Sequence, residues 1–191
     1  MAKADNKKGA NEKLYRLRVQ AEGLPPFWMD LEMRGQAKLK DLDKYLRAIW
    51  PECCNHNSEF SFGGWQGSKI PMSRRVEDIF DLGTELTHIY DFGTSSETLI
   101  KAVDVREGKP VTSHPITLLV RNVMPESECL ECEQPAKWLC MECLIEEGEW
   151  TVLCDKHAKS HPHKDYGKPV ALVNSPRLGM CGYVGPAKPP Y

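Results

Sequence analysis

The chain has 191 residues, of which 27% are charged and 41% are hydrophobic, and its formal net charge is −2. Such a chain has no overall excess of positive charge of the kind that attracts nucleic acid. It also contains no apolar run long enough to span a bilayer, so we expect no membrane-spanning helix. The length suits one medium domain followed by a small module.

The N-terminal segment MAKADNKKGA is polar and charged and has no apolar centre. It does not resemble a secretory signal peptide, and we expect a disordered basic tail over residues 1–12. The expected location is the cytoplasm, where cysteine thiols stay reduced.

Alternating side chains predict a β-hairpin directly after this tail. Apolar and polar residues alternate over Leu14–Ala21, and again over Phe27–Met33 after a turn at Glu22–Pro26. This period of two is typical of half-buried strands. Two arginines of the first strand should face two acids of the second across the polar side of the hairpin. These four residues are Arg16, Arg18, Asp30 and Glu32.

One helix and several further strands are expected after the hairpin. Apolar residues recur at helical spacing from Leu39 to Ile49, and Pro51 marks the end of the helix. Arg75–Asp81 could form a helical turn. Short strands are expected at Phe60–Phe62, His88–Phe92, Thr98–Val105 and Ile116–Arg121. This order predicts an α+β fold with a mainly antiparallel sheet and one principal helix.

The strongest chemical signal lies nearer the C-terminus, where the chain reads C-x2-C-x7-C-x2-C-x10-C-x2-H-x3-H-x-H. The residues are Cys129, Cys132, Cys140, Cys143, Cys154, His157, His161 and His163. Eight such ligands are enough for two four-coordinate zinc ions. A segment this short cannot bury enough apolar surface to fold alone, and a structural zinc ion can supply on the order of 10 kcal/mol.

The order of these pairs resembles a B-box-type zinc module, in which the first and third pairs share one ion and the second and fourth share the other. The resemblance implies a first site of Cys129, Cys132, Cys154 and His157. It implies a second site of Cys140, Cys143, His161 and His163. The last pair departs from the family, because only Pro162 separates its two histidines. Four protein ligands at each ion would make both sites structural rather than catalytic.

A rival grouping joins Cys140 and Cys143 to His157 and His161, which is the spacing of an ordinary Cys2His2 finger. Such a finger needs a helix that carries both histidines. Gly148 is a poor residue for a helix interior, and Glu149–Leu153 is strand-like. The interleaved cross-brace arrangement is therefore preferred.

Three pieces of the N-terminal part together resemble the plasmid pRiA4b ORF-3-like family, also described as passenger proteins of insertion elements. They are Leu14–Met33 with its PPFW turn, the helix Lys38–Trp50, and the YDFG motif at Tyr90–Gly93 that leads into Glu97–Val105. The resemblance covers roughly Leu14 to Val123, with Asn55–Phe60 adding to it, and is nearest to archaeal-type members with a C-terminal zinc segment. It implies little about activity.

Two departures from that family concern residues that could form a site in relatives. The family usually has an acidic residue, a Trp and a His after YDFG, where this chain has Thr94, Ser95, Ser96 and Thr98. It usually has Arg where this chain has Met29. Any site built from those residues would be absent or altered here.

The expected domain organisation follows from these patterns. A basic tail covers residues 1–12, the α+β domain covers 13–123, a zinc-binding module covers 124–173, and an irregular C-terminal tail covers 174–191.

Other candidate site residues have structural explanations that carry more weight. Trp28 lies on the polar face of its strand and could anchor a partner, but a Trp more often packs under a neighbouring loop. Asp91 lies at a hairpin turn, where Asp commonly accepts hydrogen bonds from nearby backbone amides.

A third metal site built from scattered histidines stays open, with His56 beside Cys53 and Cys54 as the most suggestive group. The adjacent cysteines could instead be small buried residues at a helix end. Cys181 is the first substitute ligand for the zinc-binding module, although the tail could simply pack across the domain through Leu178 and its neighbours.

Three functions follow, in descending order. The first is a non-catalytic, zinc-stabilised binding or regulatory protein that contacts other proteins. The second is a nucleic-acid-binding accessory protein of a mobile element, which the acidic segment Glu126–Glu149 disfavours. The third is an enzyme with a cleft in the α+β domain, for which mutual contact of Asp91, His56 or Glu97 would be the first indication.

Overall fold

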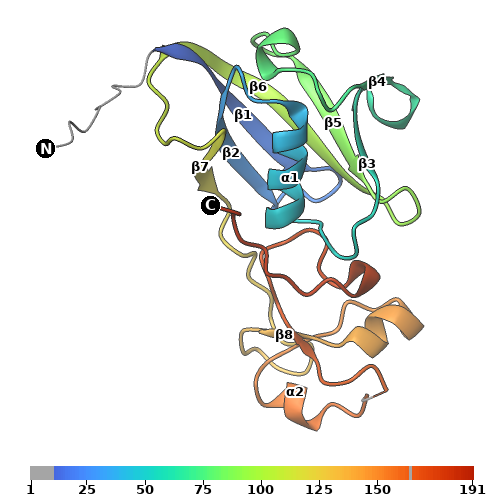
Figure 1. Ribbon diagram of the computed structural model, residues 1–191. Coiled ribbons are helices and arrows are strands. Elements are labelled where there is room, and N and C mark those ends of the chain that lie inside the picture. The colour runs from blue at the N-terminus through green and yellow to red at the C-terminus, as the bar shows by residue number, and fades with distance from the viewer. Residues whose placement is uncertain (1–10, 164) are drawn as a thin grey trace, which may run out of the picture.

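The computed structural model describes residues 11–163 and 165–191 of the chain. A seven-stranded antiparallel sheet with one long helix forms the larger part, and a smaller part with short elements lies at one end of it (Figure 1). The expected α+β fold is therefore confirmed. The expected tail lies outside the described residues except for its last two positions, and the second of these, Glu12, already belongs to a strand.

The hairpin predicted from alternation is present as β1 (Glu12–Ala21) and β2 (Trp28–Arg34), with Leu17 opposite Leu31. Gly23, at a φ of 72°, makes the turn between them, a conformation that glycine adopts without steric cost. The remaining strands are β3 (Ser58–Phe62), β4 (Ser68–Ile70), β5 (Glu85–Tyr90), β6 (Ser96–Gly108) and β7 (Ile116–Arg121). Two single turns of 3-10 helix, η1 (Gly64–Gln66) and η2 (Val76–Asp78), lie in the connections.

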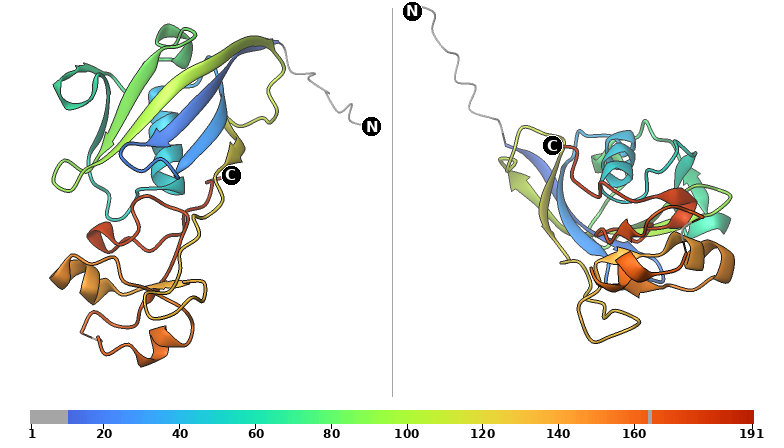
Figure 2. Two further views of the ribbon diagram at one scale, coloured as in Figure 1. Left: turned by 180° about the vertical axis from the view of Figure 1, so that it is seen from behind. Right: turned by 90° about the horizontal axis from the view of Figure 1, so that it is seen from below.

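The strand order of this sheet is β4-β3-β5-β6-β1-β2-β7, so β4 and β7 form its edges and the first strand, β1, lies inside it. The helix α1 (Leu39–Ile49) covers one face of the sheet, as the views from the front and from behind agree (Figures 1 and 2). Its Leu42 and Leu46 are buried against apolar side chains of β1 and β2. Together β1–β7 and α1 are called the sheet region below.

The polar face of the hairpin differs from expectation in one detail. Arg16 and Arg18 both bind Asp30, with Arg16 Nη2 at 2.5 Å and Arg18 Nη1 at 3.1 Å from its carboxylate. Glu32 instead pairs with Arg106, which β6 brings alongside. Glu32 has a different partner from the one expected because β6 pairs with β1, and the sequence of the hairpin alone does not indicate this pairing.

The ring of Trp28 packs against a guanidinium of the neighbouring strand. The guanidinium of Arg18 lies 3.8 Å from the centre of its ring.

The smaller part, residues 124–173, is called the Cys/His module below. Its three-stranded sheet has the order β10-β8-β9, from β8 (Trp138–Leu139), β9 (Val152–Leu153) and β10 (Val170–Ala171). A single π-helical turn, η3 (Cys143–Glu147), and a four-residue helix, α2 (His157–Ser160), complete it. Of the strand-like segment Glu149–Leu153, only the last two residues form a strand, β9.

The C-terminal tail, residues 174–191, returns from the Cys/His module to the sheet region (Figure 2). The Ser175 hydroxyl donates to the carbonyl of Trp50 at 2.9 Å, just after α1. Leu178 and Tyr183 are buried, as tail packing requires, whereas Met180 stays 37% exposed. The turn of 3-10 helix η4 (Met180–Gly182) therefore sits at the surface beside the sheet region.

Within the described residues, no helix combines the length and the apolar character needed to cross a membrane.

Candidate metal centres

The first cluster contains Cys129, Cys132, Cys154 and His157, whose ligand atoms all lie within 4.8 Å of one another. A tight turn, in which the Cys132 amide donates to the Cys129 carbonyl at 3.1 Å, points the first two sulfurs to one side. β9 ends directly before Cys154, and α2 begins at His157. His157 Nδ1 is 3.3 Å from Cys129 Sγ and 3.6 Å from Cys154 Sγ.

The second cluster contains Cys140, Cys143, His161 and His163. The two cysteines flank the start of η3, and the two histidines follow α2. Cys143 Sγ lies 3.3 Å from His161 Nε2 and 3.1 Å from His163 Nδ1. The proline between the histidines does not prevent both rings from meeting the same sulfur.

These two groups are the interleaved arrangement, and the rival finger is not formed. His157 lies with the first cluster rather than with Cys140 and Cys143. α2 is four residues long and ends before His161, so it does not carry both histidines of a finger.

The separations suit four-coordinate metal. Zn–S bonds of about 2.3 Å and Zn–N bonds of about 2.0 Å at tetrahedral angles place ligand atoms roughly 3.4–3.8 Å apart. The sulfur–nitrogen distances in the second cluster run from 3.1 to 3.9 Å. Both clusters could therefore hold a metal ion without a change of backbone.

Burial, followed by the neighbouring thiol of Cys140, raises the pKa of Cys143 to about 11. A bound divalent ion would deprotonate its thiol ligands outright.

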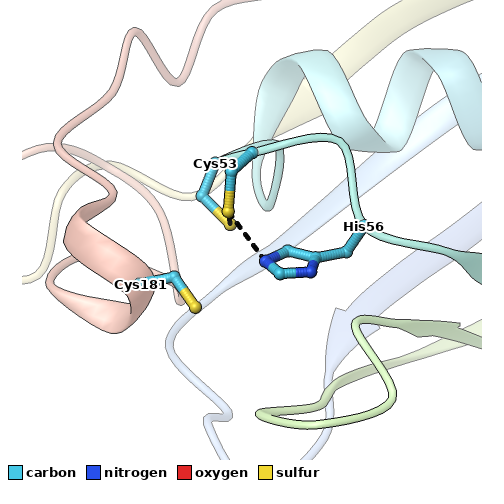
Figure 3. A group of neighbouring side chains, drawn as sticks. Cys53, His56 and Cys181 are labelled. Atoms are coloured by element: carbon cyan, nitrogen blue, oxygen red, sulfur yellow. Dashed lines mark hydrogen bonds between the residues drawn. The ribbon is translucent and has the colours of Figure 1, made fainter.

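A third cluster brings Cys53, Cys54 and His56 together with Cys181 (Figure 3). The first three follow α1 in the sheet region, and the fourth comes from η4 in the C-terminal tail. Cys181 therefore lies with the sheet region's thiols and not beside the Cys/His module, where it would have been the first substitute ligand. This group, too, could hold a metal ion.

Asp91 and Arg177 lie directly beside the third cluster. Asp91 accepts hydrogen bonds from the amides of Gly93 and Thr94, which is the turn role expected for it. It also receives Arg177 Nη2 at 2.6 Å. Burial raises the pKa of the Asp91 carboxyl, but these hydrogen bonds, with Arg177 foremost, outweigh it and lower the pKa to about 2. No local pattern in the sequence indicates this ion pair, because its partners lie far apart in the chain.

Two of the residues whose contact would suggest an enzyme do meet. His56 Nε2 lies 3.5 Å from Asp91 Oδ2, and the same nitrogen lies 2.8 Å from Cys54 Sγ. A Cys-His-Asp relay needs the thiol on one ring nitrogen and the carboxylate on the other. Here one ring nitrogen of His56 faces both groups, so this geometry does not form such a relay. Glu97 lies elsewhere, bound to the Trp65 indole at 2.9 Å.

The other histidines have structural roles. His88 is fully buried on β5, and its Nε2 lies 2.8 Å from a carboxylate oxygen of Asp43 on α1. Burial raises the pKa of Asp43, but hydrogen bonds from His88 and Ser58 outweigh it, so the pKa lies below its ordinary value. His114 is stacked on Tyr191 at 4.2 Å between ring centres.

A largely apolar groove of about 480 Å³ lies where the sheet region, the Cys/His module and the C-terminal tail meet, and it is called the junction groove below. Exposed apolar side chains from all three parts line it, among them Leu24 at 40%, Trp150 at 50% and Met180 at 37% exposed. Residues of the tail, among them Pro176 and Leu178, form part of this lining.

Comparisons with known proteins assign no function. No protein-family model and no curated protein matches the chain. The crystal structure of MM3350, a protein of unknown function from Methanosarcina mazei Go1, is similar at a TM-score of 0.47 and 21% sequence identity. The similarity covers 56% of this chain and 68% of that one.

Proposed function

We propose that this chain is a non-catalytic protein that two structural zinc ions stabilise and that binds a partner protein. The first ion is held by Cys129, Cys132, Cys154 and His157, and the second by Cys140, Cys143, His161 and His163. The observation that supports this best is that each cluster supplies four protein ligands. Four protein ligands fill a tetrahedral site and leave no position for a substrate.

The proposed binding surface is the junction groove, and its proposed occupant is an apolar segment of a partner protein with basic residues on its flanks. The apolar lining would receive the segment, since half-exposed side chains such as Trp150 gain most from being covered. The basic flanks would face glutamates of the Cys/His module, two of which, Glu126 and Glu149, adjoin in sequence residues that line the groove. The glutamates of the module are Glu126, Glu128, Glu131, Glu133, Glu142, Glu146, Glu147 and Glu149.

The same charges argue against nucleic acid as the partner, because phosphates would meet this acidic surface. An accessory role in a mobile element therefore has less support. A catalytic role also has less support, because the same nitrogen of His56 faces both Cys54 and Asp91. Membership of the pRiA4b ORF-3-like family stays part of the proposal, supported by the sequence motifs alone. So does a cytoplasmic location, where thiolate ligands stay reduced.

The test is peptide selection from a random display library against the full, zinc-loaded chain. Enriched peptides should combine apolar residues with Lys or Arg. Trp150→Ser should weaken their binding at least tenfold, while Leu82→Ser should leave it unchanged. Leu82 is the matched control, because it is 70% exposed and lies outside the groove.

Peptides that bind both variants equally well would remove the junction groove from the proposal. Binding of a labelled oligonucleotide that weakens steeply with salt would replace it with the nucleic-acid hypothesis.

A further inference from the structure

We infer that Cys53, Cys54, His56 and Cys181 form a third metal site, which takes a thiolate-preferring divalent ion such as zinc and fastens the C-terminal tail to the sheet region. The site lies outside the Cys/His module and does not depend on partner binding. Its ligands come from positions more than a hundred residues apart in the chain.

The donor set is the first support. Three thiols and one imidazole present ligand atoms that all lie within 4.8 Å of one another, with Cys53 Sγ and Cys54 Sγ 3.6 Å apart. Soft thiolate ligands with one imidazole favour zinc among the common divalent ions. The pair of Cys54 and His56, at 2.8 Å, would open to about 3.5 Å on binding. Rotation of Cys54 allows this, because its side chain is exposed.

The backbone around the cluster is the second support. Asn55, Asp91 and Cys181 adopt positive φ angles of 60°, 64° and 48°. Residues other than glycine rarely adopt this conformation, and a cysteine gains no local hydrogen bond of the kind that helps Asn and Asp. In this chain the conformation turns His56 and Cys181 toward the same point (Figure 3). Strained backbone of this kind is found where a site requires it.

The surroundings are the third support. Arg177 is fully buried, and its Nη2 lies 3.5 Å from Cys53 Sγ as well as beside Asp91. A guanidinium in this position stabilises a thiolate and offsets part of the negative charge of three sulfurs. Its Nη1 donates to the Thr94 carbonyl at 2.7 Å, so the tail reaches the cluster in a fixed orientation.

The experiment is metal counting by mass spectrometry on the full chain, purified with a phosphine reductant and no chelator, loaded with zinc and desalted. We expect three zinc ions per chain in the wild type and two in Cys181→Ser and in Cys54→Ser. Cys143→Ser should also lose one ion, which calibrates the count. His114→Ala, a histidine outside the three clusters, should keep three.

A second measurement distinguishes the loss of this metal site from misfolding of a variant. Hydrogen exchange of Met180–Tyr183 should slow on addition of zinc in the wild type but not in His56→Ala, while exchange in β1 and β6 stays unchanged in both. Two zinc ions in the wild type, with no loss in Cys181→Ser, would overturn the inference. A disulfide that joins any two of Cys53, Cys54 and Cys181 under these reducing conditions would overturn it as well.

Discussion

The sheet region and the Cys/His module differ in the kinds of side chain that fill their interiors. The core of the sheet region consists of apolar side chains that β1, β2 and α1 bury completely, such as Leu17 and Leu31. The first buried cluster of the Cys/His module contains Leu153, and its other fully buried members are cysteines. A second buried cluster of the module is apolar and consists of Leu139, Met141, Val152 and Leu178, the last from the C-terminal tail. Apolar burial alone therefore holds the larger part, whereas the smaller part combines a small apolar cluster with side chains suited to metal coordination.

The largest difference between the two parts should appear when metal is removed. Chelation should abolish amide protection in β8 and β9, and Cys140→Ser, which removes one site, should reduce it, because a structural zinc ion supplies on the order of 10 kcal/mol. Hydrogen exchange followed by mass spectrometry measures this, with β1 and β6 as the internal control. A Cys/His module that keeps its protection without metal would break the comparison.

The contact between the tail and the sheet region should give the next largest effect. Arg177→Met leaves the carboxylate of Asp91 buried without its partner, which typically costs about 3–5 kcal/mol. Urea unfolding measures the loss. The double variant with Asp91→Asn should recover part of it, and equal losses in the single and double variants would show that the ion pair itself is not responsible.

The core of the sheet region should respond independently of metal. Leu42→Ala removes a fully buried side chain of α1 and should lower the free energy of unfolding by about 2–5 kcal/mol. The metal content of the folded variant should stay at the wild-type value. Leu82→Ala, at an exposed position, should change stability by less than about 0.5 kcal/mol. A loss of metal in Leu42→Ala would show that the two parts are coupled.

The smallest effect should come from the buried pair of Asp43 and His88. The pKa of Asp43 is lower in the folded chain, so its stabilising contribution is present above the unfolded pKa of about 4 and is lost as the pH falls through the folded pKa. Asp43→Asn should therefore cost about 1–3 kcal/mol at pH 7 and progressively less below pH 4. Urea unfolding across this pH range, with exposed Asp78→Asn as the control, checks the trend. A cost that does not change with pH would contradict it.

Periodicity alone identified the hairpin, the principal helix and most strands, because each depends on residues close in sequence. It did less well with strand length. β6 extends to Gly108 rather than Val105, since β1 on one side supplies hydrogen-bond partners along that whole length. Periodicity also did not predict the partner of Glu32, because Arg106 lies on β6, which is distant in sequence and pairs with β1 in the sheet.

The candidate metal sites divide in the same way. The sequence by itself determined the eight candidate ligands of the Cys/His module, because chelating pairs are local, and the resemblance to a B-box-type module implied the interleaved grouping in which the structure places them. Only the tertiary structure decided that Cys181 meets Cys53, Cys54 and His56, and that Arg177 meets Asp91. No local pattern contains such contacts, since they depend on the path by which the C-terminal tail returns to the end of α1.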